Sequence, residues 1–357
     1  MTPATRVLVT DDSVTQRELL VTILESDAGI AVVGQARTGE EAVRMAIELR
    51  PDLITMDVHM PVMDGLAATK RIMSRVPTPI IILTGSSAGG EVHLSLDAIG
   101  AGALMLLSKP RNPRSAGFDT ERAHLIAMVK TLAQVKVVRL TGAPGSDGGA
   151  PVDRPSVRMP VPGVAAFPRR RVRLVVMAAS TGGPAALSRV LGALPADFPA
   201  PILVVQHIAV NFVDGLAQWL DANCRLEVRV AKHGDPARVG TVYLAPDDRH
   251  LGVREDGRLV VTDSPGESGF RPSADHLFAS AARAFGADVV AVILTGMGSD
   301  GIIGLRAIHE AGGYVVAQDA ATSVVYGMPR EAAKAGIAHV VLPLPGVAAA
   351  LVNLVRT

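Results

Sequence analysis

The 357-residue chain has very little of several features that define common protein classes. Its single cysteine, Cys224, excludes an intrachain disulfide framework and a cysteine-rich metal site, so a reducing compartment is expected. Aromatic residues make up only 3% of the chain, and the formal net charge is +1. Because neither a basic surface nor aromatic platforms for stacking bases are indicated, nucleic acid is not an expected partner.

Long apolar runs are also missing. No stretch approaches the roughly 18 uninterrupted apolar residues of a membrane span, so we expect no membrane insertion. The first residues lead directly into a short apolar segment, without the basic and hydrophobic regions of a secretion signal. The sequence therefore predicts a cytoplasmic protein.

The chain is rich in small and aliphatic residues, with 48% hydrophobic residues and 35 glycines, and it is long enough for two domains. From residue 6 to residue 139, short apolar runs alternate with stretches of helical period, giving five β/α units. This alternation is typical of a doubly wound parallel sheet with helices on both faces. It resumes at Val172. We predict an α/β protein with an N-terminal (βα)5 domain in residues 1–140 and a second doubly wound, mostly parallel domain in residues 172–357.

Residues 141–171 lack this periodicity. Glycine and proline dominate the segment, which ends in three consecutive arginines, Arg169 to Arg171. Such a composition is typical of a linker that is extended where proline is frequent. We interpret the arginines as a solvated end of this linker rather than as a docking site.

Five polar residues follow strands of the first domain, at the edge of a parallel sheet where ligands bind. Asp11 and Asp12 follow the first strand, Asp57 the third, Thr84 the fourth and Lys109 the fifth. Three converging carboxylates would favour a hard cation such as Mg²⁺, and one of them could then accept a phosphoryl group. Thr84 and Lys109 are placed to contact its oxygens. Taken singly, each acidic residue could instead be a helix cap.

The segments VTDDS, MDVHMPVMDG, ILTGSS and LLSKP resemble the receiver domain of bacterial response regulators, and the likeness covers residues 6 to about 139. The resemblance implies a phosphoacceptor, an Mg²⁺ site and two phosphate-sensing residues. By this resemblance Asp57 is the phosphoacceptor. Mg²⁺ is held by Asp11, Asp12, Asp57 and the Val58 carbonyl, and Thr84 and Lys109 sense the phosphate. A flavin-type nucleotide binder of the same topology is the alternative, but the chain has no glycine-rich phosphate loop after its first strand.

The resemblance has one visible departure. Leu106 stands three residues before Lys109, where receivers usually carry a switch tyrosine or phenylalanine. Phosphate acceptance should be unaffected, whereas the signalling transition would not use rotation of an aromatic ring. The resemblance also implies a cis peptide bond at Lys109–Pro110.

The first strand of the second domain ends in a turn of small residues around Ser180, just before a helix. Such a turn exposes a serine hydroxyl, so Ser180 is the candidate nucleophile, and the Thr181 N–H at the helix start could stabilise an oxyanion. Ala178 replaces the usual first glycine of this motif. Ser180 could instead be only a helix cap, or Gly182 and Gly183 could bind a phosphate.

His207 follows the next strand and Asp300 follows a later one, so the three reactive side chains are expected at neighbouring strand ends. A neutral imidazole there could take the serine proton, and the carboxylate could orient it. His233, His250 and His276 also lie near loops, but the position of His207 directly after a strand favours it.

The segments AASTGGP, VVQHI, VYLAPDDRHL, RPSAD, AVILTGMGSDG and AQDAATSVVYGMPREA resemble the chemotaxis protein-glutamate methylesterases over residues 172–345. The resemblance implies that Ser180 is the nucleophile, His207 the general base and Asp300 its orienting partner. It places the oxyanion hole at the N–H groups of Thr181 and Met297. It implies no metal in this half. The segment Ile208 to Asn211 and the residue Phe270 depart from the family pattern at the mouth of the site.

Together the two resemblances imply a phosphorylation-regulated enzyme that hydrolyses glutamate γ-methyl esters on chemoreceptors and deamidates receptor glutamines. Its expected partners are methyl-accepting chemoreceptors and a chemotaxis histidine kinase as phosphodonor, and the chain is expected to be a monomer. Two other functions stay open. The chain could be a non-enzymatic phosphate sink or scaffold with a degenerate hydrolase domain, or a hydrolase of small esters.

Overall fold

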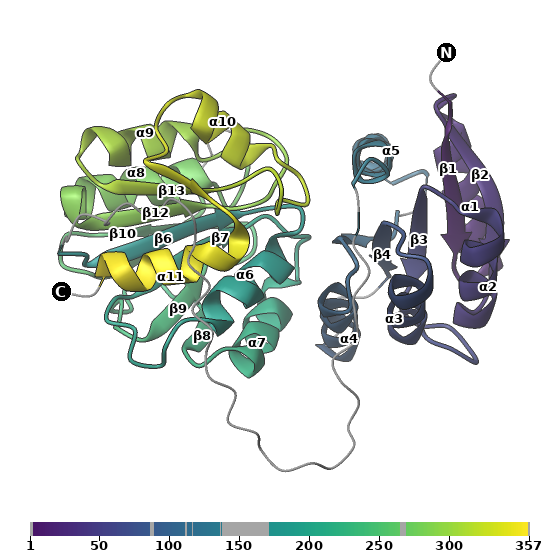
Figure 1. Cartoon of the computed structure of the whole chain (residues 1–357), viewed down its shortest axis with the longest axis horizontal. Coiled ribbons are helices and arrows are strands. Elements are labelled where there is room, and N and C mark those ends of the chain that lie inside the picture. The colour runs from purple at the N-terminus through teal and green to yellow at the C-terminus, as the bar shows by residue number, and fades with distance from the viewer. Residues whose placement is uncertain are drawn as a thin grey trace, which may run out of the picture.

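A computed structural model describes residues 3–85, 89–110, 113–115, 117–135, 137, 171–264 and 269–355. Within these residues the chain forms two parallel sheets, each covered by helices on both faces (Figure 1). The predicted α/β fold with two doubly wound domains is therefore confirmed. The predicted linker, apart from Arg171, lies outside the described residues.

The first sheet has the strand order β2-β1-β3-β4-β5, with all neighbouring strands parallel. The strands are β1 (Thr5–Thr10), β2 (Ile30–Ala36), β3 (Leu53–Asp57), β4 (Ile80–Thr84) and β5 (Met105–Ser108). The helices are α1 (Val14–Glu25), α2 (Gly39–Leu49), α3 (Gly65–Arg75), α4 (Gly89–Gly100) and α5 (Phe118–Leu132). The five predicted β/α units are all present.

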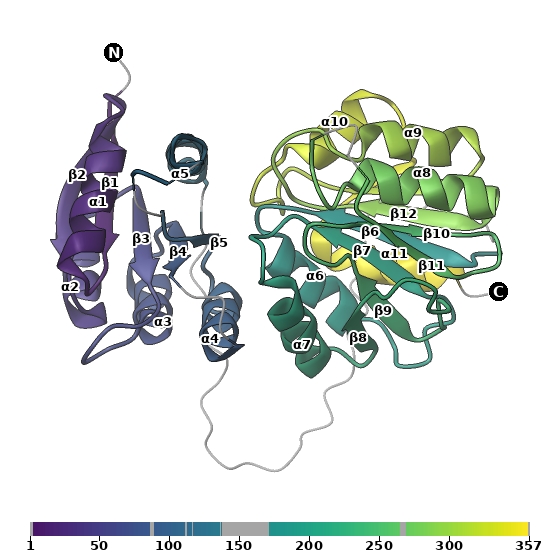
Figure 2. The ribbon, with the colours of Figure 1, turned by 180° about the vertical axis from the view of Figure 1, so that it is seen from behind.

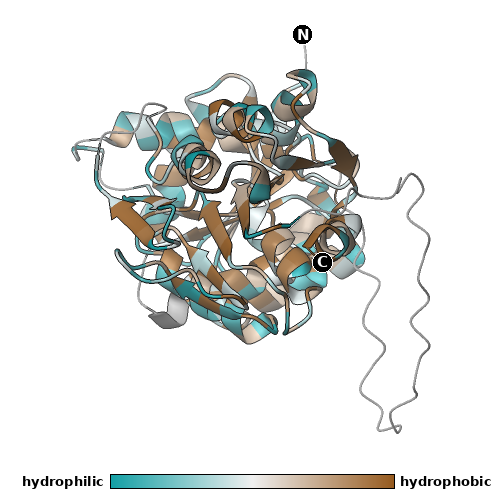
Figure 3. Cartoon of the chain, turned by 90° about the vertical axis from the view of Figure 1, so that its left-hand side faces the viewer, coloured by the Kyte–Doolittle hydropathy of each residue, from teal (hydrophilic) through white to brown (hydrophobic). Residues whose placement is uncertain are grey.

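Alternate residues of these strands point to opposite faces, as the pleat requires. Leu8 and Ile82 pack with α2, α3 and α4, whereas Val9 and Ile81 pack with α1 and α5. A strand that is buried on both faces must be apolar throughout, which accounts for its continuous hydrophobic run. Figure 3, which is seen from the side of the second domain, shows that the strands facing the viewer there are likewise mostly hydrophobic.

The second sheet has the order β14-β13-β12-β6-β7-β9-β8, again with parallel neighbours. Its strands are β6 (Leu174–Ala179), β7 (Ile202–Gln206), β8 (Glu227–Val230), β9 (Thr241–Leu244), β12 (Val289–Ile293), β13 (Tyr314–Gln318) and β14 (Val340–Leu342). A separate antiparallel pair is formed by β10 (His250–Val253) and β11 (Leu259–Thr262). Figure 2 shows this pair close to α8, which is in contact with β10.

The helices of the second domain cover the two faces of this sheet. They are α6 (Gly183–Gly192), α7 (Val213–Asn223), α8 (Ala274–Phe285), the short 3₁₀ helix η1 (Gly286–Asp288), α9 (Ile302–Glu310), α10 (Met328–Lys334) and α11 (Leu344–Val355). Residues of α6, α7 and α11 pack on one face, and residues of α8, α9 and α10 pack on the other. The sequence prediction missed α10, β14 and α11.

The two domains touch through α4 and α7, which lie side by side at their boundary (Figure 1). The indole N–H of Trp219 on α7 donates to Asp97 Oδ1 on α4 at 3.0 Å, and His93 Nε2 lies 2.9 Å from Gln218 Oε1. A Cβ on Gly215 of α7 would collide with the Val92 side chain of α4. The absence of a side chain at position 215 therefore permits the close approach of these helices.

One expectation about the backbone is wrong. The cis peptide bond in the described part of the chain is Arg271–Pro272, and Lys109–Pro110 is not cis. Among the described residues, no helix combines the length and the apolar character needed to cross a bilayer.

Candidate functional site

The carboxylates predicted for the first domain do converge at one edge of its sheet. Oxygen atoms of Asp11, Asp12 and Asp57 lie within 4.8 Å of one another. The Asp11 and Asp57 side chains are nearly inaccessible to solvent, and Asp12 is exposed. The parallel pairing of β1 with β3 produces this convergence, because it brings their carboxyl ends to the same edge.

Lys109 reaches into this cluster from the end of β5. Its Nζ lies 2.8 Å from Asp11 Oδ2 and 2.8 Å from Asp57 Oδ2. Burial by itself would lower the pKa of Lys109, but the ion pairs with these two carboxylates outweigh it and raise that pKa. For Asp57, burial is the larger influence and raises the pKa of the carboxyl despite Lys109.

The donor set of this cluster fits a hard divalent cation. It consists of oxygen ligands, and a single lysine faces two buried carboxylates, so further positive charge is favoured. The Val58 carbonyl accepts from the Gly65 N–H at 2.9 Å and has a second lone pair that could serve a metal. Thr84 is buried at the end of β4, and its carbonyl accepts from the Lys109 N–H at 2.8 Å.

In the second domain, Ser180 lies directly after β6, which is flanked by β7 and β12 in the middle of the sheet. Its N–H donates to the Thr295 carbonyl at 3.0 Å, which places it against the loop that follows β12. A Cβ on Gly296 would lie 2.7 Å from the Ser180 Cβ, so position 296 requires glycine for this approach. Ser180 Oγ forms no hydrogen bond with another described residue.

His207 and Asp300 meet at the same edge. His207 Nε2 lies 2.9 Å from Asp300 Oδ2, and both side chains are largely buried. The His207 N–H also donates to the Ala179 carbonyl at 3.0 Å, which fixes the histidine backbone beside Ser180. With Nε2 on the carboxylate, Nδ1 is the ring nitrogen left to receive a proton.

The Asp300 carboxylate is surrounded by donors besides His207. Oδ2 accepts from the Ala274 N–H at 2.7 Å, and Oδ1 accepts from the Ser273 hydroxyl at 2.9 Å. Burial alone would raise the pKa of Asp300, but the bonds from His207, Ala274 and Ser273 outweigh it and lower that pKa to about 2. Asp300 is therefore an anion at neutral pH, oriented by the first turn of α8.

The two backbone N–H groups expected to form an oxyanion hole are not engaged in hydrogen bonds with other described residues. Within the described residues, neither the Thr181 N–H nor the Met297 N–H donates to another protein group. Thr181 precedes α6, where unpaired N–H groups and the helix dipole favour negative charge. Gly296 accepts from the N–H groups of Gly327 and Met328, which holds the loop before Met297 in place.

Two polar residues that the sequence analysis did not single out hold the ends of the strands. The Gln206 amide Nε2 donates to the carbonyls of Ser180 and His207, at 2.8 Å each. The Thr295 hydroxyl donates to the Thr181 carbonyl at 2.9 Å. Gln206 directly precedes His207 and Thr295 directly precedes Gly296, and this adjacency was the signal in the sequence that could have identified them. The other three histidines near loops have different contacts. His250 Nδ1 accepts from the Ser273 N–H, His276 stacks on His250, and His233 Nδ1 accepts from the Val261 N–H.

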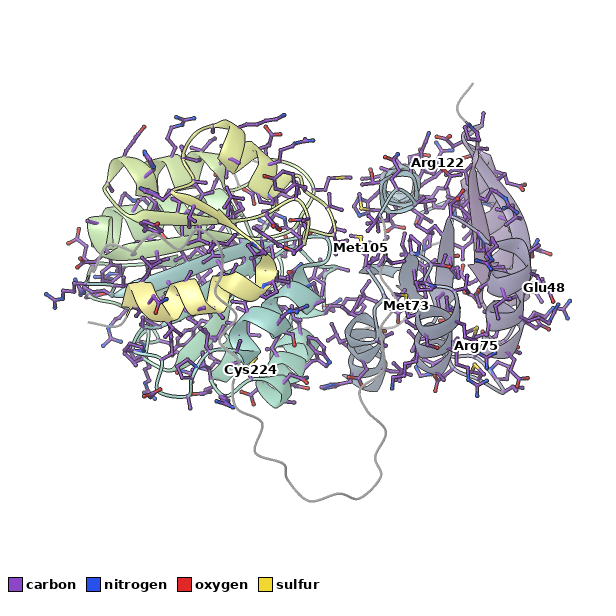
Figure 4. All side chains as sticks on the ribbon, in the orientation of Figure 1. Glu48, Met73, Arg75, Met105, Arg122 and Cys224 are labelled. Carbon is purple, nitrogen blue, oxygen red and sulfur yellow. The ribbon has the colours of Figure 1, made fainter. Side chains whose placement is uncertain are left out.

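A cavity of about 660 Å³ lies between the two domains. It is lined by Ser180 and His207 from the second domain and by Thr84 and Lys109 from the first. Met105, on β5 at the boundary between the domains (Figure 4), also lines it. The side chains expected for catalysis and those expected to sense a phosphoryl group thus share one space.

The first domain also packs on the catalytic loops. Met297 and Val324 of the second domain contact the apolar cluster that is built from β1, β4, α1 and α5 of the first. Since Met297 follows Gly296 beside Ser180, this packing brings the first domain directly against the candidate active site.

Comparison with known proteins gives matches to both halves. Residues 7–116 match the response regulator receiver domain, and residues 175–351 match the CheB methylesterase family. Protein-glutamate methylesterase/protein-glutamine glutaminase 4 of Myxococcus xanthus is 50% identical, covering 98% of this chain and 97% of that protein. Protein-glutamate methylesterase/protein-glutamine glutaminase 3 of Anaeromyxobacter dehalogenans is 49% identical, covering 94% of this chain and 95% of that protein.

Among solved structures, the CheB methylesterase catalytic domain of Thermotoga maritima matches with a TM-score of 0.50 and 39% identity. The match covers 51% of this chain and 98% of that domain. The receiver-type sheet, the serine-histidine-aspartate cluster and the full-length likeness all support membership of one family. The chain belongs to the protein-glutamate methylesterase/protein-glutamine glutaminase family, with a receiver domain followed by a CheB methylesterase domain.

Proposed function

We propose that this chain is a phosphorylation-regulated hydrolase that removes methyl esters from glutamate side chains of chemoreceptors and deamidates receptor glutamines. The observation that carries the proposal is the His207–Asp300 hydrogen bond of 2.9 Å beside Ser180, in a cavity large enough for an extended side chain. The names of its full-length relatives supply the substrate class. A phosphodonor kinase is the partner that the receiver domain requires, and the protein is taken to act as a cytoplasmic monomer.

The proposed mechanism is acyl transfer. Ser180 Oγ attacks the ester carbonyl while His207 Nδ1 takes its proton, and Asp300 stabilises the imidazolium through Nε2. The N–H groups of Thr181 and Met297 bind the oxyanion. The proton held by His207 then passes to the departing methoxide, which leaves as methanol. A water molecule attacks the remaining ester to Ser180, His207 takes its proton and returns it to Ser180 Oγ, and the glutamate is released. For a glutamine substrate, ammonia leaves in place of methanol.

The first domain would supply the control. Asp57 is the proposed phosphoacceptor, with Mg²⁺ held by Asp11, Asp12, Asp57 and the Val58 carbonyl. The cation would offset the charge of the incoming phosphoryl oxygens. Lys109, which pairs with Asp11 and lies 2.8 Å from Asp57 Oδ2, is within reach of a group transferred to Asp57, and Thr84 lines the same cavity as Lys109. The proposed domain boundaries stay as predicted, with the receiver in residues 1–140, the linker in 141–171 and the methylesterase in 172–357.

The direct test is methanol release from methylated receptor membranes, measured with and without a small-molecule phosphodonor and Mg²⁺. We expect release by the wild-type chain and a several-fold increase with the phosphodonor. Asp57→Asn should keep the basal rate and lose the increase, because it keeps the shape of the side chain but cannot be phosphorylated. Absence of methanol release under both conditions would contradict the proposed activity.

The unphosphorylated receiver is proposed to obstruct the active site. This is supported by the packing of Met297 and Val324 against the first domain and by the α4–α7 contact. Phosphorylation would weaken that interface and shift the population toward an open arrangement. Trp219 is the only tryptophan of the chain and lies buried in the interface, so its fluorescence should report the opening.

Gly215→Ala is a targeted way to open the interface. Its Cβ would collide with Val92 of the receiver, whereas alanine inside α7 should favour the helix itself. We expect a several-fold higher basal rate of methanol release and a red-shifted Trp219 emission. The double variant Gly215→Ala/Val92→Ala removes the colliding side chain and should restore the low basal rate. A red shift without a higher rate would contradict obstruction by the receiver.

A further inference from the structure

The imidazole of His207 is held by more than its carboxylate. The Phe270 ring stacks on it, with 4.8 Å between the ring centroids and 11° between the planes. Phe270 is 44% exposed, which is unusual for so large an apolar side chain, and it lines the same cavity as Ser180 and His207. An exposed phenylalanine that covers one face of the proposed general base calls for a reason other than core packing.

Phe270 is placed by its neighbour Arg271. The Arg271 guanidinium makes a two-pronged ion pair with Asp248, with Nε 2.7 Å from Oδ1 and Nη2 2.9 Å from Oδ2. Its Nη1 also donates to the Asp263 carbonyl at 3.0 Å. Exposed ion pairs contribute little to stability, but a two-pronged geometry fixes direction. These contacts therefore anchor the loop that carries Phe270.

The adjacent residue Asp247 holds the other loop beside His207. Its Oδ2 accepts from the Asn211 N–H at 2.7 Å, four residues after the histidine. Both Asn211 and Asp248 have positive φ, 72° and 52°, a conformation that needs support from its surroundings. We call this pair of neighbouring carboxylates the Asp247–Asp248 clasp. It ties together the two loops that flank the histidine.

We propose that Phe270 is a positioning residue for His207, set in place by the Arg271–Asp248 half of the clasp. The torsion that turns an imidazole about its Cβ–Cγ bond has a broad minimum, and one hydrogen bond at Nε2 leaves the ring free to tilt around it. A nearly parallel ring at 4.8 Å restricts this rotation, so the imidazole keeps the orientation in which Nε2 meets Asp300 and Nδ1 is left to take the serine proton. The inference rests on the proposed serine-histidine-aspartate mechanism.

The test compares kcat and KM for methanol release, with the phosphodonor present so that the receiver does not obstruct the site. Phe270→Leu keeps an apolar side chain but no flat ring, and we expect kcat to fall about 10-fold with KM within about twofold. Phe270→Tyr restores the ring and should restore kcat. An unchanged kcat in Phe270→Leu, or a raised KM alone, would overturn the positioning role.

The anchoring step is tested by additivity. Arg271→Ala should lower kcat as Phe270→Leu does, and the double variant should be no slower than either, because both changes act through one contact. If the kcat of the double variant falls by the product of the two single losses, Arg271 acts independently of Phe270 and the anchoring step is overturned. The matched control is Asp256→Asn, which breaks the exposed Arg254–Asp256 pair outside the cavity and should leave kcat unchanged.

Ser180→Ala, assayed in the same series, separates the two proposals. If Ser180→Ala releases methanol at the wild-type rate, the proposed mechanism fails. If Ser180→Ala is inactive while Phe270→Leu keeps the wild-type kcat, the mechanism stands and the positioning role alone fails.

Discussion

Replacing Ser180 by alanine should lower the rate of methanol release by about 10⁶-fold, the order of loss found when a serine hydrolase loses its nucleophile. The alanine variant keeps the proposed oxyanion donors Thr181 and Met297 and the His207–Asp300 pair, but it lacks the hydroxyl that would form the proposed acyl intermediate. What is left would be the modest acceleration that binding and the oxyanion hole supply. The measurement is methanol released from methylated receptor membranes in the presence of the phosphodonor.

A matched serine elsewhere in the domain gives the control. The Ser280 hydroxyl donates to the Leu277 carbonyl and accepts from the Val253 N–H, so Ser280→Ala costs structural hydrogen bonds away from the cavity. Its thermal midpoint should fall while its rate stays near that of the wild type. Ser180→Ala should do the reverse. A similar loss of rate in both variants would mean that Ser180 matters for folding rather than for chemistry.

The members of the candidate site could be predicted from the sequence because each one lies at the end of an apolar run. Parallel strands present their carboxyl ends at one edge, so Ser180, His207 and Asp300 had to come close if their strands are neighbours. The observed order β12-β6-β7 satisfies that condition. The same reasoning placed the acidic cluster of the first domain, where β1 pairs with β3 and β3 with β4.

The contacts that orient these side chains could not be predicted in this way. Ser273 caps the N-terminus of α8, and its bond to Asp300 depends on how that helix crosses the sheet. The stacking of Phe270 on His207 depends on a loop held by Arg271. The sequence recorded Phe270 only as a departure from a family pattern. Such contacts follow from tertiary packing, which residue spacing does not encode.

The C-terminal part of the second domain was missed for another reason. The segment of α11 is apolar over most of its length, with buried residues from Gly346 to Val355, so it lacks the polar face that marks a surface helix. The strand β14 has only three residues, Val340–Leu342, too few for an alternating pattern to be recognised. The cis bond expected at Lys109–Pro110 came from resemblance alone, and the structure has it at Arg271–Pro272 instead.

Asp300→Asn should reduce the rate of methanol release by about 10³- to 10⁴-fold with little change in KM. Asparagine has the same shape, but it is neutral and carries only one acceptor atom. Its NH₂ group would face N–H or O–H donors, because Ser273, Ala274 and His207 all direct hydrogens at this carboxylate. The variant would lose both the orientation of the imidazole and the negative charge that stabilises it as a cation.

Asp275→Asn is the matched control, because the Asp275 side-chain Oδ1 accepts from the Gly304 N–H at 2.8 Å, while its backbone N–H, 3.3 Å from Asp300 Oδ1, is kept in the variant. Burial raises the pKa of Asp275, and the nearby Asp300 carboxylate raises it further, so a neutral asparagine there removes no charge on which Asp300 depends; the pKa of Asp300 itself is lowered to about 2. Near-normal activity is expected for Asp275→Asn. An equal loss of activity in both variants would indicate a general disturbance of α8.

The lowered pKa of Asp300 also predicts how the stability of the wild type and that of Asp300→Asn differ with pH. A carboxylate with a pKa of about 2 in the folded chain and about 3.9 when unfolded stabilises the fold fully only above about pH 5. This contribution, on the order of 2 kcal/mol, is lost as the pH falls toward 2. Asp300→Asn should therefore have a lower thermal midpoint than the wild type at pH 7, and the difference should narrow between about pH 5 and pH 2. A difference that is constant over that range would mean that the ionised carboxylate is not the stabilising species.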